Sequence, residues 1–452
     1  RRQADMPTIS TPNGGVMEEA EALALFEQVG FTPPPGVPTE DAFNMLMQLA
    51  QQQMQEESNA RPGRGRTAKV PEPATAEAAA AVLAAHSASV VPIAPCGCEI
   101  KGLDLAGRGG TLEGDLAGAV ELLMAIHGFV LFRNQGHEPN ESGVSGQYLS
   151  AEQQCALSEN FGAGKLHSTH GVHPEAPCRD IFRLSNDPNH GFNSVGPEWH
   201  NDGSFCREVF GHVVYHVIKA PSGAGDTQFA HLGIAYDKLP SAGVQARLKR
   251  CASVNSNGGA VHPVASAHAL SGRTSLYLHF GMTGAILETL DAVPHSTHVA
   301  SGAGVSAPSL FGDGTTPADL PGPKAGAAGE ALSHVRAWRD AEMDTFFTAL
   351  SEHLDRPDIS YSHKWQQGDV IIIDNLAVAH KAAPGAHTLA EGLRILHRTT
   401  ILSARAFDPP AELKLPHTLP TDGPCPFQQG ATWAEGYVGF RWGQWDKRAT
   451  PH

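Results

Sequence analysis

Short apolar or alternating runs, separated by turn-forming residues, follow one another from about residue 90 onward. Runs of this kind, bounded by Gly, Pro, Asn, Asp or Ser, are typical of β-strands. We expect strands at Val90–Ile93, Gly128–Phe132, Asp180–Leu184, Val213–Ile218, Ser275–Phe280, Val370–Asp374 and Leu393–Ile401. Because the expected strands are many and short while long helices are few, the pattern favours a closed sandwich or barrel.

Apolar positions with helical spacing interrupt the strands and also occur in the N-terminal region. We expect helices at Leu116–Ile126, Ala151–Phe161, Leu332–Leu354, Glu18–Val29 and Thr39–Glu57. In the last of these, Thr39 can cap the first turn, and the acidic residues that follow it suit the positive end of the helix dipole. The fold class expected from these patterns is mainly β with flanking helices.

Composition divides the chain into parts. Residues 1–90 combine the two N-terminal helical patterns with linker-like sequence such as Arg61–Arg66, so we expect a helical extension. Residues 91–408 form the main domain, and within it 296–330 is a Gly/Ala/Ser/Pro-rich insert that we expect to be a flexible surface loop. Residues 409–452 are expected to pack on the domain as a tail. The extension either packs on the main domain as well or presents a Met-bearing helix to a protein partner or a second copy.

The charge balance is acidic, with 32 Lys plus Arg against 47 Asp plus Glu and a formal net charge of −15. This argues against general affinity for nucleic acid or anionic membranes. Seven cysteines with one close pair, Cys96 and Cys98, fit neither a disulfide framework nor a zinc ribbon. We therefore expect an intracellular, reducing location, cytoplasmic or in an organelle. No apolar run is long enough for a transmembrane helix, and because the first residue is Arg, a leader could precede the sequence.

Candidate metal chemistry begins in the segment Trp199–Phe205, which contains His200 and Asp202. On an extended backbone, residues two apart point to the same side, so these two side chains can bind one ion together. An imidazole and a carboxylate form part of the face of two histidines and one carboxylate that holds non-haem iron(II). The pattern alone is weak, because the chain has 24 histidines.

Two later segments add to this chemistry. His380 follows the buried strand Val370–Asp374, and Arg394 and Arg398 lie four residues apart on the next expected strand, hence on one face. A guanidinium inside a barrel needs an anion, and its fork suits a carboxylate. Either an anionic ligand takes this place, or both arginines pair with Asp or Glu of the core.

These segments resemble the taurine and chlorophenoxyacetate dioxygenase (TauD/TfdA) family. The family's marks are a Trp-His-x-Asp-x-Ser/Thr-Phe segment, a late Asp-Asn-x4-His and an Arg-x3-Arg strand, here at Trp199–Phe205, Asp374–His380 and Arg394–Arg398. The similarity runs from about Ile93 to Ala404, outside the insert. Further matching segments occur in the expected order, at Gly97–Leu105, His127–Gln135, Gly223–Phe229, His262–Val264 and Ser271–Arg273.

The resemblance implies a double-stranded β-helix, the jelly-roll core shared with cupins, and an Fe(II)- and 2-oxoglutarate-dependent dioxygenase. Such an enzyme uses O2 to hydroxylate or oxidatively cleave a small, here anionic, organic substrate, with release of succinate and CO2. His200, Asp202 and His380 would hold the iron. The distal carboxylate of 2-oxoglutarate would bind Arg394 and the Thr227 hydroxyl. Arg398 would either meet the substrate anion or only support its strand.

Other residues fall where the family binds substrate. His167, His170 and His173 lie at the start of the family's substrate loop, where they could bind an anion or be solvated loop residues. Asn255 is a further pocket candidate. Met282 stands where the taurine enzyme has an aromatic wall, and Gly196 and Leu376 also depart from the family pattern. The departures at Gly196 and Met282 argue against taurine as the substrate.

Two alternatives remain at this point. One is a catalytically retired barrel that acts as a binding or assembly protein through its N-terminal helices. The other is a cupin oxygenase with different chemistry, which would have no need of Arg394. Dependence on 2-oxoglutarate distinguishes the expected dioxygenase from both.

Overall fold

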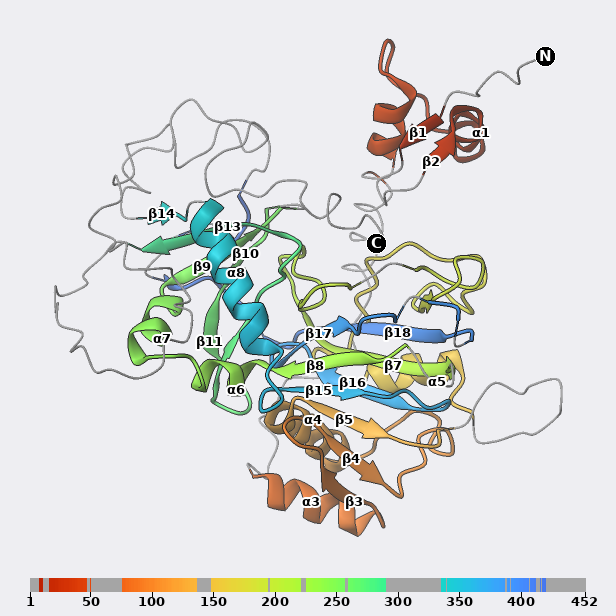
Figure 1. Cartoon of the computed structure of the whole chain (residues 1–452). Helices are drawn as coiled ribbons and strands as arrows, with labels where there is room; N and C mark the ends of the chain where they lie inside the picture. Colours follow the sequence, from red (N-terminus) through yellow and green to blue (C-terminus); the bar gives the residue numbers. More distant parts are fainter. Residues whose placement is uncertain are drawn as a thin grey trace.

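A seven-stranded sheet organises the molecule. The computed structural model describes residues 8–10, 16–46, 49, 75–135, 148–193, 196–220, 225–256, 259–289, 335–338, 340–386, 388–390, 392–405, 407–411, 415 and 417–419. Along the sheet the strands follow the order β3 (Ser89–Pro92), β4 (Cys98–Lys101), β5 (Phe129–Phe132), β16 (Val370–Asp374), β7 (Phe210–Lys219), β18 (Ile395–Leu402) and β6 (Phe182–Ser185). Pairing is antiparallel throughout except between β4 and β5, which are parallel (Figure 1).

A three-stranded antiparallel sheet packs against the inner face of the large one. It consists of β15 (Ser360–His363), β8 (Thr227–His231) and β17 (Val378–Ala382). Phe229 and Val378 of this sheet belong to the same buried cluster as Phe129, Val213 and Ile371 of the seven-stranded sheet. Because side chains alternate across a strand, this cluster fills the space between two facing sheets.

Helices cover the outer face of the seven-stranded sheet. They are α3 (Ala76–Ala85), α4 (Asp115–His127) and α5 (Ala151–Ser158). Helix α4 buries Leu116, Val120 and Leu123 in one cluster with Val214 and Ile372, which lie on outward positions of β7 and β16 (Figure 1). Ala79 and Leu83 of α3 join the same cluster. Since α3 is part of this core, we propose that the main domain begins before α3 rather than at residue 90.

A second lobe is built from smaller sheets and further helices. Its strands are β9 (Cys251–Asn255), β10 (Val261–Pro263), β11 (Ala265–Ala267), β12 (Thr274–Leu276), β13 (Thr283–Thr289) and β14 (Val335–Ala337). Its helices are α6 (Leu232–Asp237), α7 (Ala242–Leu248) and α8 (Asp340–Leu354). Trp338 and Phe346 pack with Trp199 in a buried cluster that joins α8 to the segment carrying His200.

The N-terminal region has its own small core. Strands β1 (Thr8–Ser10) and β2 (Val16–Glu18), helix α1 (Glu19–Val29) and helical residues 39–46 bury Phe26 and Phe43 together. The expected helix at Glu18–Val29 is thus confirmed, and helical residues 39–46 agree with the start of the expected second helix at Thr39–Glu57, most of whose remaining residues lie outside the described part of the chain. This region also exposes large apolar side chains, namely Leu23, Val29, Met45 and Leu49.

The expectation of a mainly β fold with flanking helices is confirmed, whereas the double-stranded β-helix stays a prediction. One expected helix was wrong at its start: Val335–Ala337 form β14, paired with β13, and α8 begins only at Asp340. The apolar residues of β14 lie only a few positions before α8, so the helical spacing of apolar residues runs through both elements and the helix was predicted to begin too early. The expected strand Ser275–Phe280 is shorter, since β12 ends at Leu276.

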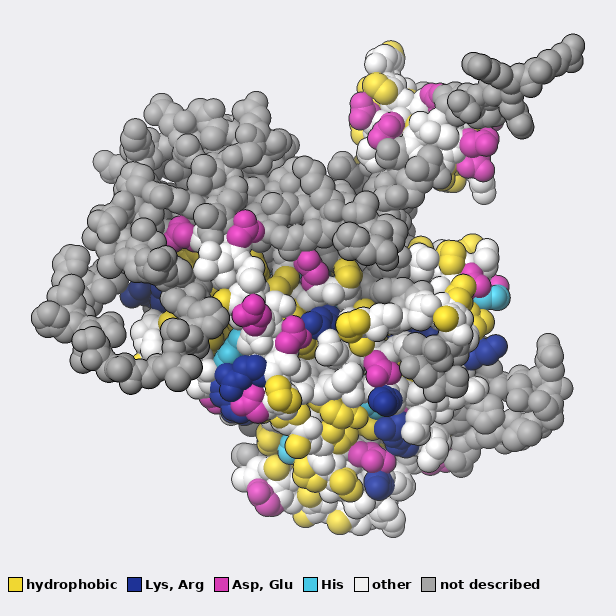
Figure 2. All heavy atoms as spheres, viewed as in Figure 1, with side chains coloured by type: hydrophobic (Ala, Val, Ile, Leu, Met, Phe, Trp, Pro, Cys, Tyr) yellow, Lys and Arg dark blue, Asp and Glu magenta, His cyan; other side chains and the backbone are white. Residues whose placement is uncertain are grey.

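The expected insert at 296–330 lies outside the described residues, as does most of the tail. At the start of the tail, Thr418 forms a bridge with Ala260, and Leu419 is buried against β9, β10 and β13. Figure 2 shows acidic and basic side chains interspersed over the described part of one face. None of the described helices has the length and apolar character needed to cross a membrane.

Candidate metal centre and cosubstrate site

Two segments far apart in sequence are paired through their backbones at the centre of the site. The His200 amide donates to the His380 carbonyl at 3.1 Å, and the His380 amide donates to the His200 carbonyl at 3.0 Å. This antiparallel bridge adds the His200 segment to β17. It also brings the two imidazole ring centres to 4.2 Å from each other.

Amide side chains fix the turn that carries Asp202. The Asp202 amide donates to Asn375 Oδ1 at 3.0 Å, and Asn375 Nδ2 donates back to the Asp202 carbonyl at 2.9 Å. Asn201 points the other way, donating to the carbonyls of Asn375 and Val378. Asn201 therefore stabilises the turn, whereas the side chains of its neighbours His200 and Asp202 face the site.

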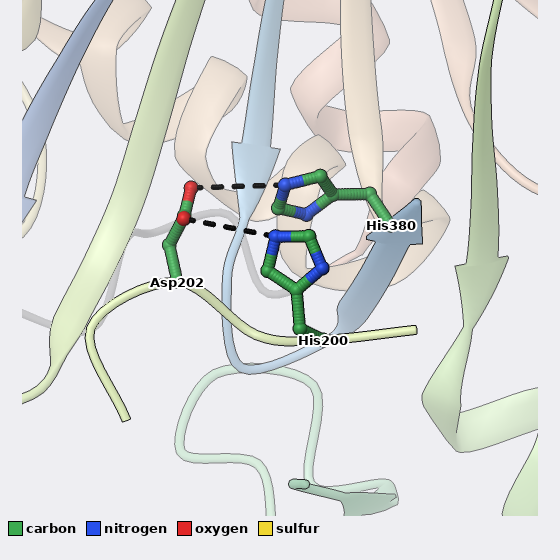
Figure 3. A group of neighbouring side chains, drawn as sticks. All are labelled: His200, Asp202 and His380. Atoms are coloured by element: carbon green, nitrogen blue, oxygen red, sulfur yellow. Dashed lines mark ion pairs between the residues drawn. The ribbon is translucent and has the colours of Figure 1, made fainter. Parts of the chain in front are cut away.

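The side chains of His200, Asp202 and His380 converge (Figure 3). One ligand atom from each lies within 4.8 Å of the others, and the three residues are only 7%, 7% and 8% exposed. The Asp202 oxygens lie 4.0 Å from His200 Nε2 and 3.8 Å from His380 Nε2. His200 Nδ1 lies 2.7 Å from the Glu198 carbonyl, which can only accept, so Nε2 is left unprotonated as a ligand. These donor atoms fit a divalent transition metal.

Two donors from the seven-stranded sheet also reach the carboxylate. Arg398 Nη1 donates to Asp202 Oδ1 at 2.9 Å, and the Tyr215 hydroxyl donates to Asp202 Oδ2 at 3.0 Å. Burial opposes ionisation of Asp202, but Arg398, His380 and His200 outweigh it and lower the pKa of Asp202 below its usual value. The carboxylate is therefore ionised and ready to bind a cation.

Gly196 makes room for the first histidine. It has φ of +68°, and a Cβ at this position would lie 2.8 Å from His200 Cε1. The Gly196 carbonyl also accepts from the Ala382 amide at 2.7 Å, which continues the pairing along β17. A departure from the family pattern thus has a local reason here, because a larger residue would push on the ring.

The candidate cosubstrate residues lie near one another at the start of β8. Arg394 is 7% exposed, and its Nη1 donates to the Gly225 carbonyl at 2.7 Å, two residues before Thr227. No carboxylate of the described residues lies within ion-pair distance of Arg394, and its buried Nε has no hydrogen-bond partner among them. Thr227 Oγ1 accepts from Trp365 Nε1 at 3.0 Å, which leaves the hydroxyl proton available to donate.

The two arginines therefore differ. Arg398 is paired with Asp202, as expected for a core ion pair, whereas no carboxylate in the described part of the chain pairs with Arg394, and an external anion would complete its guanidinium. Arg394 also precedes β18 rather than lying within it, so the expected strand Leu393–Ile401 began two residues too early. Ser185 and Asn186 bind the Arg394 backbone and hold it in place.

The substrate-side histidines separate as well. His170 packs on Phe182 with ring centres 4.7 Å apart, and the Arg398 guanidinium stacks on the same ring at 4.4 Å. Burial, together with Arg398, lowers the pKa of His170 to about 4. His167 is fully buried against Phe210, and His173 packs on Phe192 instead. Of the three histidines, His170 is the one that lies beside Arg398.

Asn255 and Met282 support the site from the second lobe. Asn255 Nδ2 donates to Ser204 Oγ at 2.9 Å, just after the Asp202 turn. The Met282 amide donates to His279 Nδ1 at 3.2 Å, and the His279 ring lies 5.0 Å from that of His200. Asn255 thus contacts the segment that carries His200 and Asp202 directly, and the Met282 backbone reaches the His200 ring through His279.

Sequence reasoning missed Tyr215. Alternation along β7 places it on the same face as Val213 and Val217, inside the sandwich, where it is the polar member of an otherwise apolar set. A single polar side chain on the inward, otherwise apolar face of a strand was the signal in the sequence that could have identified Tyr215 as a candidate site residue. His279 was missed too, because it lies in the expected strand Ser275–Phe280 without a recognisable pattern.

Comparison with known families agrees with this geometry. The family model described as taurine catabolism dioxygenase TauD, TfdA family matches residues 89–400, well over half of the chain. The chain belongs to the TauD, TfdA family. Its membership confirms the expected enzyme class, that of the Fe(II)- and 2-oxoglutarate-dependent dioxygenases.

Individual relatives are distant. The chain is 27% identical over 276 residues to the α-ketoglutarate-dependent 2,4-dichlorophenoxyacetate dioxygenase of Cupriavidus pinatubonensis, covering 57% of this chain and 82% of that one. It is 23% identical over 308 residues to the α-ketoglutarate-dependent sulfate ester dioxygenase of Pseudomonas putida, covering 68% and 86%. A solved taurine dioxygenase from Burkholderia xenovorans is 23% identical, with a TM-score of 0.46 and coverage of 70% and 91%.

Proposed function

We propose that His200, Asp202 and His380 hold Fe(II), and that Arg394 and Thr227 bind the distal carboxylate of 2-oxoglutarate. The observation that carries the cosubstrate assignment is the buried Arg394 guanidinium, which has no carboxylate partner among the described residues and whose Nε has no hydrogen-bond partner there. A buried charge without a partner is costly, so it is retained where a ligand completes it. 2-Oxoglutarate has a carboxylate at each end. One carboxylate would pair with Arg394, and the keto-acid end would bind the metal.

The residues around the site divide the work. Arg394 and the Thr227 hydroxyl would fix the far carboxylate, and this orients the keto-acid end towards the three ligands. Bound Fe(II) would supply the oxygen chemistry that releases succinate and CO2 and oxidises the substrate. Burial of the ligands would exclude water from the reacting atoms.

We infer that the substrate is a small anionic organic molecule, which the enzyme hydroxylates or oxidatively cleaves. The named relatives act on a phenoxyacetate and on a sulfate ester, and both carry an anionic group. His170 and Phe182 lie beside Arg398, so an anionic group near this arginine would meet an aromatic surface as well. Binding there would compete with Asp202 for Arg398, and this competition would couple substrate binding to the metal ligand.

Metal and cosubstrate binding test the proposal directly. Wild-type protein should bind Mn(II), bind 2-oxoglutarate more tightly in its presence, and form succinate from 2-oxoglutarate with Fe(II) and O2. Asp202→Ala should lose both metal binding and succinate formation. A matched control is Asp358→Ala, an exposed carboxylate paired with Lys238 and Arg356, which should behave like wild type.

Wild-type protein that binds no metal and forms no succinate would favour the alternative of a retired barrel. We propose a double-stranded β-helix core in either case, since two facing sheets enclose the site. The exposed apolar side chains of the N-terminal region are the place where a protein partner or a second copy would bind.

A further inference from the structure

Tyr215 connects the seven-stranded sheet to the candidate metal centre. It lies directly opposite Arg398 in the β7–β18 pairing, so both side chains enter the space between the sheets from neighbouring positions. Each donates to a different oxygen of Asp202, Tyr215 to Oδ2 at 3.0 Å and Arg398 to Oδ1 at 2.9 Å. Both oxygens of the Asp202 carboxylate thus accept hydrogen bonds from the seven-stranded sheet, while Asn375 holds the Asp202 backbone.

The same hydroxyl also reaches a histidine ligand. Tyr215 Oη lies 3.0 Å from His380 Nε2, the nitrogen that faces Asp202. Because the hydroxyl donates to Asp202, the contact with His380 requires its oxygen to accept from a protonated Nε2. A metal bound at Nε2 replaces that proton, so the contact with His380 must break while the bond to Asp202 can persist.

We propose that Tyr215 is a positioning residue of the metal centre. Together with Arg398 it fixes the orientation of the Asp202 carboxylate, so that a carboxylate lone pair points towards the metal in a defined direction. This inference rests on the proposed metal site. A carboxylate held by one donor only can rotate, and hydrogen-bonding partners of metal ligands typically change metal affinity by about 10- to 100-fold when removed.

The chain offers a matched pair of variants. Tyr215 and Tyr236 are both 5% exposed, and each uses its hydroxyl as a donor, but Tyr236 donates to the Gln245 carbonyl, away from the ligands. In Tyr215→Phe we expect the Mn(II) dissociation constant to rise by about 10- to 100-fold. In Tyr236→Phe it should equal that of wild type. The absorption spectrum of the Co(II)-loaded protein should change in Tyr215→Phe alone, since it reports the geometry of the ligands.

The outcomes distinguish this inference from the proposed function. If wild type binds no Mn(II), the metal site is refuted and the role of Tyr215 with it. If wild type binds Mn(II) and Tyr215→Phe binds it equally well with an unchanged Co(II) spectrum, only the inference is refuted.

Should Tyr215→Phe not fold, as judged by its thermal unfolding without metal, the wild-type protein supplies the test. Zn(II) should then produce a tyrosine ultraviolet difference spectrum that Tyr236→Phe retains, because the contact between Tyr215 and His380 breaks. Its absence would overturn the inference.

Discussion

Replacing Arg394 with methionine should change folding and ligand binding in different ways. The variant loses one charge-assisted hydrogen bond, to the Gly225 carbonyl, which is worth about 1.5–3 kcal/mol. It also removes a buried charge whose desolvation costs several kcal/mol and which no carboxylate of the described residues offsets. The two effects oppose each other, so we expect the free energy of unfolding to stay within about 2 kcal/mol of wild type.

The affinity for 2-oxoglutarate should fall much further. Truncating one partner of a buried, hydrogen-bonded charge pair costs about 2–5 kcal/mol, which corresponds to roughly 30- to 4,000-fold in the dissociation constant. Calorimetric titration of 2-oxoglutarate into the Mn(II)-loaded protein measures this change, and urea denaturation of the metal-free protein measures the stability. Metal binding itself should be unaffected, because Arg394 is not a ligand.

Arg247→Met is the control for the effect on stability. Arg247 donates two hydrogen bonds, of 2.8 and 2.9 Å, to the buried carboxylate of Glu288. Removing it leaves Glu288 with the Trp338 Nε1 donor and with Arg250 at 3.8 Å, so the variant should lose about 3 kcal/mol, the low end expected for breaking a buried pair. The reasoning is refuted if Arg394→Met loses as much stability as Arg247→Met and still binds 2-oxoglutarate like wild type.

Two further predictions concern the metal pocket and acid stability. Gly196→Ala should weaken Mn(II) binding, as measured by titration, because the added Cβ would lie 2.8 Å from the His200 ring; unchanged affinity would contradict the packing argument. Burial lowers the pKa of His216 from 6.5 to about 4, so the unfolded state binds the extra proton and stability is lost as the pH falls from 6.5 towards 4. Neither ring nitrogen of His216 has a hydrogen-bond partner among the described residues, so His216→Leu should reduce that pH slope by up to about 1.4 kcal/mol per unit in denaturation measured across this range. An equal or steeper slope in the variant would count against this account.

Local patterns predicted much of the sheet but not its partners. The runs that became β5, β7 and β16 are continuous and apolar because both of their faces are buried, one under α4 and the other between the sheets. The short strands β8, β9 and β13 were not predicted as strands. Their sequences mix polar and apolar residues without a clear alternation, and these residues adopt the strand conformation through pairing with neighbouring strands. The start of α8 was misplaced for the related reason that Val335–Ala337 pair with β13, a contact invisible to helical periodicity.

The site shows the same division. Residue types and their spacing along the chain predicted the candidate ligands: His200 and Asp202 at a spacing of two, a later His380, and an arginine suited to a carboxylate. Three features appear only in the folded chain: the backbone of His200 pairs with that of His380, Arg398 and Tyr215 share the Asp202 carboxylate, and Arg394 has no carboxylate partner among the described residues. Spacing along the chain limits which neighbours can share a face, whereas partners some 180 residues apart are chosen by sheet pairing and burial.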